Sequence, residues 1–185
     1  MRVFGIDPGS ERTGYGCVET DGSRHQLIAS GAITALVSDT FPARLARIHA
    51  ELTRLLAECR PDSVAIENLF HASNARSALK LGHARGVAML AAVQAGCEVA
   101  EYTPAEVKRA VVGYGRAEKA QVQQMVKVLL GLDHLPTPHD AADALAVAIC
   151  HVHARPATAA RSALLSARTG SKPEARSWRQ YRPAR

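Results

Sequence analysis

Aromatic side chains are scarce in this sequence, at 4% of its 185 residues, so we expect a hydrophobic core of alanine, valine, leucine and isoleucine. Cysteines are also few: there are four, widely scattered, and no two form a Cys-x-x-Cys pair. This spacing is typical of reduced thiols and argues against a disulfide framework or a zinc site. We therefore expect a cytoplasmic protein.

Long apolar runs are missing as well. The longest, residues 87–93 and 144–150, are far too short to cross a bilayer. No basic segment leads into an apolar one at the start of the chain, so we expect no signal peptide. The length and the 47% of hydrophobic residues fit one globular domain of ordinary size, and we expect no membrane partner.

An excess of basic charge is confined to the C-terminal end. The formal net charge is +6, but residues 154–185 hold eight lysines and arginines and one glutamate, which leaves the rest of the chain close to neutral. Within that rest, residues 76–127 are net basic, and the segments before and after them are net acidic. Basic charge of this kind suits a polyanionic partner such as nucleic acid, although the variation within the body is also ordinary for a protein surface.

The hydrophobic periodicity predicts three strands in succession, followed by alternating helices and strands. Strands are expected at residues 2–7, 13–20, 25–35, 63–67 and 98–102. Helices are expected at residues 42–59, from Ser73 or Asn74 to 96, at 104–112 and 117–130, and from His139 to about His153. This order predicts an α/β fold with a five-stranded mixed sheet flanked by helices, in which parallel strands extend an antiparallel meander.

One folded domain is expected over residues 1–153. Residues 154–185 are rich in arginine, alanine and serine, contain three prolines and lack sustained periodicity, so we expect a basic, disordered tail there. Trp178 and Tyr181 alternate with arginines in this tail. That pattern is compatible with DNA binding, with docking of a partner, and with solubilising disorder.

Two acidic residues end two of the predicted buried strands. Asp7 follows VFGI, and Glu67 follows VAI. Functional residues gather at the carboxyl ends of parallel strands, so both are candidate site residues. For Asp7 a structural role in the Pro8-Gly9 turn is an alternative, because aspartate commonly caps such turns. Glu67 has no comparable alternative.

Two further acids lie at the entrance of the last predicted helix. Asp140 and Asp143 are three residues apart and share a helix face, but His139 and Asp143, four apart, also share one. The helix dipole explains an acid at Asp140 better than one at Asp143, which lies a full turn in. Four carboxylates gathered together would repel one another unless cations lay between them, and oxygen ligands of this type suit Mg²⁺ or Mn²⁺.

Five stretches of the chain together resemble the RuvC family of Holliday-junction resolvases, which have the RNase H-like fold. They are FGIDPGSERTGYG (4–16), VAIENLF (64–70), NARSALKLGHARGVA (74–88), PAEVKRAVVGYGRAEKAQVQQMV (104–126) and DAADALAVAICHVH (140–153). The resemblance covers residues 1–153 and rests on the combination, because an Asp-x-Gly turn after a strand also occurs in actin-like ATPases.

The resemblance implies an endodeoxyribonuclease that resolves four-way DNA junctions in recombination and repair. A homodimer would nick two like strands symmetrically and leave 5′-phosphate and 3′-hydroxyl ends. Two Mg²⁺ ions per subunit, for which Mn²⁺ can substitute, would be held by the acids, and a RuvA–RuvB motor would be the branch-migration partner. The implied catalytic and metal-binding residues are Asp7, Glu67, Asp140 and Asp143, with Asp7 between both ions. The family pattern thus selects Asp140 over His139, which is left in a supporting position.

The resemblance also implies three DNA-binding residues. Phe70 would stack on junction bases, and Lys108 and Lys119 would contact the scissile phosphate. Without the resemblance, Phe70 would be read as a hydrophobic anchor and the lysines as a solvated helix face. Arg76, Lys80 and Arg85 are expected to contact either phosphates or solvent.

Two other features stay open. Gly82 and Gly86 permit close approach of another element, either the sheet or the helix of a second subunit. The stretch CHVH (150–153) looks like a metal-binding tract but is more commonly a helix end capped by histidines.

Three alternative functions compete with junction resolution. A nuclease for RNA–DNA hybrid would need neither Phe70 nor a dimer. An actin-like ATP-binding protein would need a second Asp-x-Gly loop, which the Val112-Gly-Tyr-Gly115 turn does not supply. A non-catalytic junction-binding protein would not need the four acids.

Overall fold

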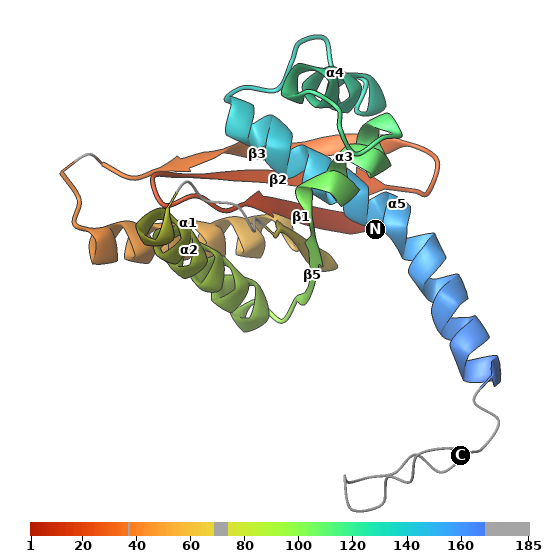
Figure 1. Ribbon diagram of the computed structural model, residues 1–185, viewed down its shortest axis with the longest axis horizontal. Coiled ribbons are helices and arrows are strands. Elements are labelled where there is room, and N and C mark those ends of the chain that lie inside the picture. Colours follow the sequence, from red (N-terminus) through yellow and green to blue (C-terminus); the bar gives the residue numbers. More distant parts are fainter. Residues whose placement is uncertain (37, 69–73, 169–185) are drawn as a thin grey trace, which may run out of the picture. The chain divides into compact units, whose positions relative to one another are not determined.

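A computed structural model describes residues 1–36, 38–68 and 74–168, with the backbone alone over 155–168. It contains a five-stranded sheet in the order β3-β2-β1-β4-β5 (Figure 1). The strands are β1 (Arg2–Asp7), β2 (Arg12–Thr20), β3 (His25–Thr34), β4 (Ser63–Glu67) and β5 (Glu98–Tyr102). The first three pair antiparallel, whereas β4 pairs parallel to both β1 and β5. The predicted mixed sheet is confirmed.

Five helices cover the sheet: α1 (Phe41–Cys59), α2 (Ala75–Gln94), α3 (Pro104–Val112), α4 (Lys119–Leu129) and α5 (His139–Arg168). Local sequence fixes several of their ends. Asn74 caps α2 by accepting a hydrogen bond from the Ser77 amide. Thr103 and Glu106 form a reciprocal capping box at the start of α3. Of the two predicted caps of α2, the structure thus uses Asn74.

The two faces of the sheet carry separate cores, because successive strand residues point to opposite sides. Helices α1 and α2 cover one face, and α3, α4 and α5 cover the other (Figure 1). Strand residues on the α1–α2 face are Phe4, Ile6, Cys17, Ile33, Val64 and Ile66. Those on the α5 face are Val3, Val18 and Ala65. Aliphatic residues and alanines dominate both cores, as expected from the scarcity of aromatics.

Helix α5 lies directly against β1 and β2 because the strand residues that face it are glycines. A Cβ atom on Gly5 would lie 2.0 Å from the carbonyl oxygen of Ala144. On Gly14 it would lie 2.1 Å from the carbonyl oxygen of Asp140. Any side chain at these two positions would push the helix away from the sheet. The close approach therefore brings the start of α5 to the carboxyl end of β1.

The last helix differs from the sequence prediction, which ended it near His153. In the structure α5 continues to Arg168, because this stretch is rich in alanine, leucine and arginine, which favour helices. The disordered tail expected from residue 154 stays a prediction, and residues 169–185 lie outside the described residues. The chain divides into two compact units, Met1–Ala154 and Arg155–Arg185. Among the described residues, none of the helices has the length and hydrophobicity needed to span a bilayer.

Candidate active site

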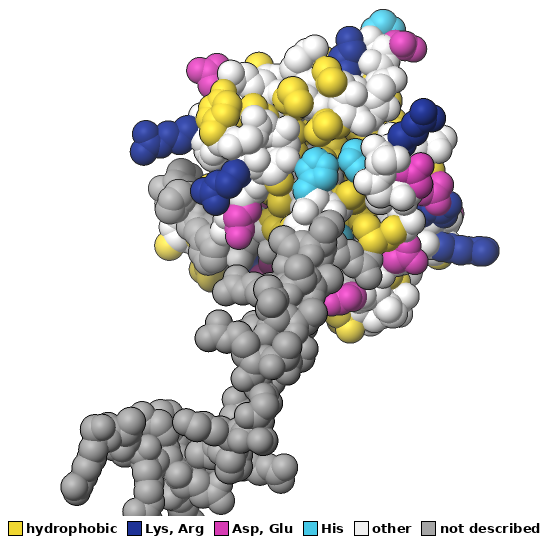
Figure 2. Space-filling view, turned by 90° about the vertical axis from the view of Figure 1, so that its right-hand side faces the viewer, with side chains coloured by type: hydrophobic (Ala, Val, Ile, Leu, Met, Phe, Trp, Pro, Cys, Tyr) yellow, Lys and Arg dark blue, Asp and Glu magenta, His cyan; other side chains and the backbone are white. Residues whose placement is uncertain are grey.

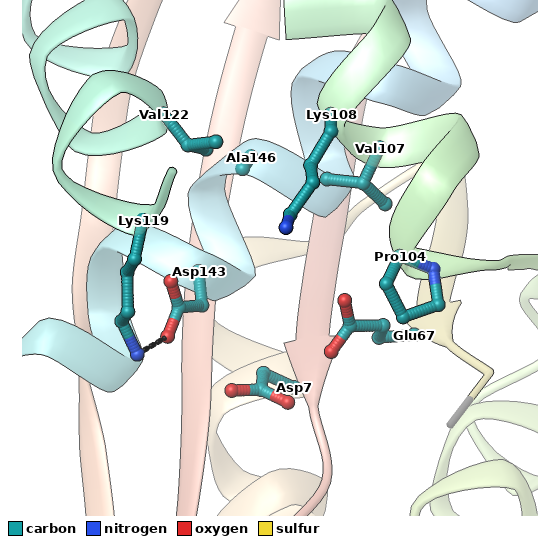
Figure 3. A pocket seen from close by; sticks show the side chains of 9 residues that line it. All are labelled: Asp7, Glu67, Pro104, Val107, Lys108, Lys119, Val122, Asp143 and Ala146. Carbon is teal, nitrogen blue, oxygen red and sulfur yellow. Dashed lines mark hydrogen bonds and ion pairs between the residues drawn. The ribbon is translucent and has the colours of Figure 1, made fainter. Parts of the chain in front are cut away.

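Asp7 and Glu67 end two neighbouring parallel strands. Ile6 of β1 is in register with Ile66 of β4, so the two acids follow at adjacent positions. Since side chains alternate along a strand, Asp7 lies on the same side of the sheet as Val3 and Gly5. By the same rule Glu67 lies on the side of Ala65. Both carboxylates therefore face α5, as Figure 3 shows.

A cavity of about 310 Å³ forms where α5, α3 and α4 meet this end of the sheet. Asp143 projects into it from the first turns of α5, opposite Asp7 and Glu67 (Figure 3). Lys108 of α3 and Lys119 of α4 also line it, with Lys119 next to Asp143. The remaining lining is largely apolar: Pro104, Val107, Val122 and Ala146. Three of the four predicted acids and both predicted lysines thus share one cavity.

The carboxylates in this cavity disfavour one another's charge. Burial, followed by the charges of Glu67 and Asp143, raises the pKa of Asp7 to about 8 from an ordinary value of 3.8. Burial also raises the pKa of Glu67, which shares a hydrogen bond with Asp7. Near neutral pH the two groups therefore hold a proton between them when no cation is bound.

Lys119 compensates part of this negative charge. Its Nζ lies 2.5 Å from Oδ2 of Asp143. Partial burial acts to lower the pKa of Lys119, but the hydrogen bond and charge of Asp143 outweigh it and raise the pKa. The side chain of Lys119 remains 60% exposed, so the ammonium group can also reach a ligand from solvent. A lysine in this position could bind a phosphate next to the carboxylates.

Asp140 lies beside the cavity and is not among its lining residues. Its Oδ2 is 3.6 Å from a guanidinium nitrogen of Arg12, at the start of β2. It is nevertheless close enough for its charge to contribute to the raised pKa of Asp7. The structure therefore places Asp140 near the other acids but turned toward Arg12. Sequence reasoning did not anticipate this role for Arg12.

His139, the other residue considered for this site, is held elsewhere. Its Nδ1 lies 2.9 Å from Nε2 of Gln123, a largely buried residue of α4. His139 is not one of the residues lining the cavity. The alternative in which His139 and Asp143 form the working pair is therefore not supported by the geometry.

Hard divalent cations fit the donors present. Within the described residues, no three His, Cys, Asp or Glu side chains are already arranged to enclose a metal ion. The donor atoms nearby are carboxylate oxygens, which Mg²⁺ and Mn²⁺ prefer. A bound cation would offset the cost of ionising Asp7 and Glu67 in a partly buried position, and it would reduce their mutual repulsion.

The other predicted DNA-binding residues are partly placed. Phe70 lies outside the described residues. Arg85 forms an ion pair with Glu101 of β5 at 2.5 Å, which gives it a structural partner. Lys80 lies over the ring of Phe41, 5.9 Å from its centroid.

Sequence reasoning also missed the glycines that face α5. The signal for two of them was present, because Gly14 and Gly16 repeat with the two-residue period of a strand.

Comparison with known proteins decides the family. A family model described as crossover junction endodeoxyribonuclease RuvC matches residues 3–151. The chain belongs to the RuvC family. A RuvC from Syntrophotalea carbinolica is 57% identical over 153 residues, which cover 83% of this chain and 94% of that protein. The RuvC from Trichlorobacter lovleyi is 51% identical over 184 residues, covering 99% of this chain and 100% of that protein.

Solved structures agree with this RuvC assignment. The Thermus thermophilus RuvC structure is 36% identical, with a TM-score of 0.79 over 85% of this chain and 97% of that chain. The same protein in complex with a Holliday junction substrate gives a TM-score of 0.78 at 34% identity, over 85% and 96% of the two chains. A yeast mitochondrial Holliday junction resolvase, at 13% identity and a TM-score of 0.65, shares the fold. The expected RNase H-like architecture is confirmed.

Proposed function

We propose that this RuvC-family chain is a metal-dependent endonuclease that resolves four-way DNA junctions by paired, symmetric nicks. The observation that carries the proposal is the group of half-buried carboxylates where β1, β4 and α5 meet, with two lysines in the same cavity. The likeness to a RuvC bound to a Holliday junction substrate supports the choice of DNA substrate. Residues 1–153 would form the nuclease domain.

Four acids would hold the divalent ions: Asp7, Glu67, Asp140 and Asp143. We propose two Mg²⁺ ions per subunit, replaceable by Mn²⁺, with Asp7 between them. Bound ions of this kind activate a water molecule and stabilise the leaving oxygen of a phosphodiester. Lys119 and Lys108 would hold the scissile phosphate and offset the negative charge that develops on it. Loss of the 3′-oxygen as leaving group gives 5′-phosphate and 3′-hydroxyl ends.

Paired nicking needs two active sites, and α2 offers a surface for a homodimer. Its exposed face carries Leu79, Leu90 and Val93, whose exposed fractions are 65%, 50% and 62%. Gly82 and Gly86 lie on the same helical stripe, and a Cβ atom at either would meet nothing within 4 Å. An apolar stripe interrupted by glycines suits close packing against α2 of a second copy. Of the two roles left open for these glycines, we propose this one.

Two further parts of the function rest on the family. We propose that Phe70 stacks on an unpaired base near the junction centre, where stacking contributes about 1–3 kcal/mol per base. We also propose that a RuvA–RuvB motor delivers the junction. A soluble, cytoplasmic protein would follow, because it would meet both the junction DNA and the RuvA–RuvB motor there.

A cleavage assay tests the function directly. The protein is incubated with Mg²⁺ and a mobile four-way junction, with linear duplex and RNA–DNA hybrid as parallel substrates. Symmetric nicks in the junction, resealable by ligase, are expected, with little cleavage of the other two. Equal cleavage of all three substrates, or undiminished cleavage by Asp7→Asn, would contradict the proposal. Release of phosphate from ATP in the same mixture would instead favour the actin-like alternative.

A further inference from the structure

A pair of histidines lies away from the candidate active site and takes no part in it. His25 begins β3, His153 lies in α5, and their Nε2 atoms are 3.4 Å apart. The separation between Asp143 and His153 along α5 corresponds to about 15 Å of helix. Figure 2 shows histidine side chains next to each other at the surface on this side of the molecule. The pair includes the last residue of the CHVH stretch (150–153).

The hydrogen bonds on the far side of each ring determine where the protons lie. Nδ1 of His153 is 3.0 Å from the carbonyl oxygen of Ala110, which can only accept, so this Nδ1 carries a proton. The hydroxyl of Thr20 donates its single proton to the carbonyl oxygen of Arg24. With the hydroxyl proton on this carbonyl, Nδ1 of His25, 3.0 Å from the same hydroxyl oxygen, can donate to it.

In the tautomer with both Nδ1 atoms protonated, the two neutral rings direct unprotonated Nε2 atoms toward each other. Two facing lone pairs repel, so this arrangement calls for a positive charge between them. Burial holds the pKa of His25 below its ordinary value against the opposing effect of Asp21. His25 is therefore neutral at neutral pH, with its lone pair available to a ligand.

We propose that His25 and His153 form a binding site for a first-row transition-metal ion such as Zn²⁺. Two nitrogens bound to one tetrahedral ion at about 2.0–2.1 Å lie about 3.3–3.4 Å apart. The separation of 3.4 Å between the Nε2 atoms matches this value without movement of either ring. Imidazole nitrogen suits Zn²⁺, Ni²⁺ and Cu²⁺, whereas Mg²⁺ prefers oxygen. The hydrogen bonds from Nδ1 to Thr20 and Ala110 orient both rings, as is usual for metal-bound histidines.

One of the two rings is exposed and also borders a cavity. A cavity of about 260 Å³ adjoins His153 and is lined also by Tyr102, Glu106, Arg109, Ala110, Cys150 and Ala154. Within the described residues no third ligand is already in place, so water completes the shell. His153 is exposed and His25 is half-buried, so an ion can enter from solvent. The site is therefore an open clamp of two histidines.

A bound ion would join segments that are distant in sequence. It would tie the start of β3 to α5 and, through the Ala110 carbonyl, to the end of α3. Because the unfolded chain lacks the pre-arranged pair, binding would stabilise the folded state in proportion to the logarithm of ion concentration. The role is structural and distinct from the proposed nuclease chemistry.

Titration of the full-length, tag-free, metal-stripped protein with Zn²⁺ and Co²⁺ tests the site. Excess Mg²⁺ is present throughout so that the carboxylates of the active site are occupied. We expect one ion per chain by calorimetry, a visible absorption band of four-coordinate Co²⁺, and a thermal unfolding midpoint that rises with Zn²⁺. His25→Gln and His153→Gln should each abolish all three effects. His49→Gln is the matched control and should change none, because it alters a half-buried histidine of α1 that is hydrogen-bonded to Gln94 of α2.

Retention of the Zn²⁺ stoichiometry by His25→Gln and His153→Gln would overturn the proposal. Absence of Zn²⁺ binding to the unmodified protein would also overturn it, and the two Nε2 atoms would then share only a proton. Nitrogen-15 spectra of the imidazoles in the unmodified protein give a measurement that does not depend on the folding of a variant. Zn²⁺ should shift the Nε2 resonances of both rings, and shifts confined to other histidines would count against the site.

Discussion

Asp7 is largely buried at the end of β1, and the charges of Glu67, Asp143 and Asp140 all act on it. At the scale of single residues this arrangement has a cost, because a buried carboxylate beside others resists ionisation. The unfolded chain carries no such restraint. The metal-free protein must therefore depend on pH in a way that a divalent ion would suppress.

The pH dependence of stability tests this conclusion. The pKa of Asp7 is about 8 in the folded state and 3.8 ordinarily, so the folded state binds the proton more tightly. Stability without metal should fall as pH rises from about 4 to about 8, and then level off. Asp7→Asn should remove the fall and raise the free energy of unfolding at pH 8 by several kcal/mol, at about 1.4 kcal/mol per pKa unit.

Urea unfolding across this pH range, with EDTA or with Mg²⁺, measures the effect. Glu98→Gln, at an exposed position that begins β5, is the control and should keep the fall. Mg²⁺ should flatten the profile of the unmodified protein. An Asp7→Asn profile parallel to that of the unmodified protein would show that Asp7 is ionised without metal.

Lys119 gives a second prediction at the residue scale. Lys119→Ala removes the ammonium group 2.5 Å from Asp143, which we expect also to contact the scissile phosphate. Cleavage of pre-bound junction in a single turnover should slow by about 10²-fold, the usual effect of losing one charge-stabilising donor. Lys119→Arg should restore part of the rate.

The same helix supplies the control for this experiment. Lys127 is half-buried in the last turn of α4 and does not line the cavity. Lys127→Ala should leave the single-turnover rate within about twofold of the unmodified protein. Equal losses in the two variants would indicate a general effect of charge on DNA binding.

At the scale of secondary-structure elements, one close contact positions these residues: the packing of α5 against β1 and β2. Helix α5 can bring Asp140 and Asp143 to the sheet only because Gly5, Gly14 and Gly16 leave space for its backbone and for Leu145. The acids at the strand ends and those on the helix thus come close together because the glycines between them have no side chains. Loss of that space should affect the site more than the fold.

Gly14→Ala tests the contact between β2 and α5. The added Cβ would lie 2.1 Å from the carbonyl oxygen of Asp140, so the first turn of α5 must shift. We expect junction cleavage to fall at least about tenfold, with a loss of stability of about 1–3 kcal/mol. Thermal unfolding and single-turnover cleavage measure the two effects separately. Normal cleavage by a stable Gly14→Ala protein would show that the start of α5 need not be fixed.

The exposed stripe of α2 gives the second prediction at the element scale. Leu90→Glu places a charge in the proposed dimer surface, and burial of that unpaired charge is unfavourable. We expect monomers in analytical ultracentrifugation and loss of paired nicking, with the fold unchanged. Val128→Glu, at a position on α4 that is 60% exposed, is the control and should remain dimeric. Dimers of Leu90→Glu as stable as the original would place the interface elsewhere.

For the whole molecule, charge is distributed unevenly between the two units. Unit Met1–Ala154 contains the sheet, the cavity and the histidine pair. Unit Arg155–Arg185 has eight basic residues and one acidic residue. A basic segment outside the nuclease domain should add affinity for DNA without adding chemistry.

Truncation after Ala154 tests this division. The shortened protein should fold and cleave pre-bound junction at a normal rate, but it should bind junction DNA more weakly. Its binding should also depend less on salt, since each lost phosphate contact lowers the slope of log K against log salt by about 0.9. Fluorescence anisotropy over a range of KCl concentrations measures the slope. An unchanged slope would show that the basic segment does not contact DNA.

Local sequence was sufficient for much of this protein. Strand and helix periods, Pro and Gly breaks and the Asn74 cap act over a few residues, so they predicted the order of elements and the mixed sheet. The ends of β1 and β4 likewise placed Asp7 and Glu67 at one edge, because parallel neighbours end together. The end of the last helix was predicted less well, since α5 continues past His153 to Arg168.

Only the tertiary structure decided which side chains meet. The contact of Asp140 with Arg12, the pairing of Lys119 with Asp143 and the approach of His25 to His153 join residues far apart in the chain. Such distances depend on how closely α5 packs on the sheet, and therefore on Gly5 and Gly14 facing its backbone. Periodicity assigns a residue to a face, but packing between elements fixes its neighbours and hence its charge state.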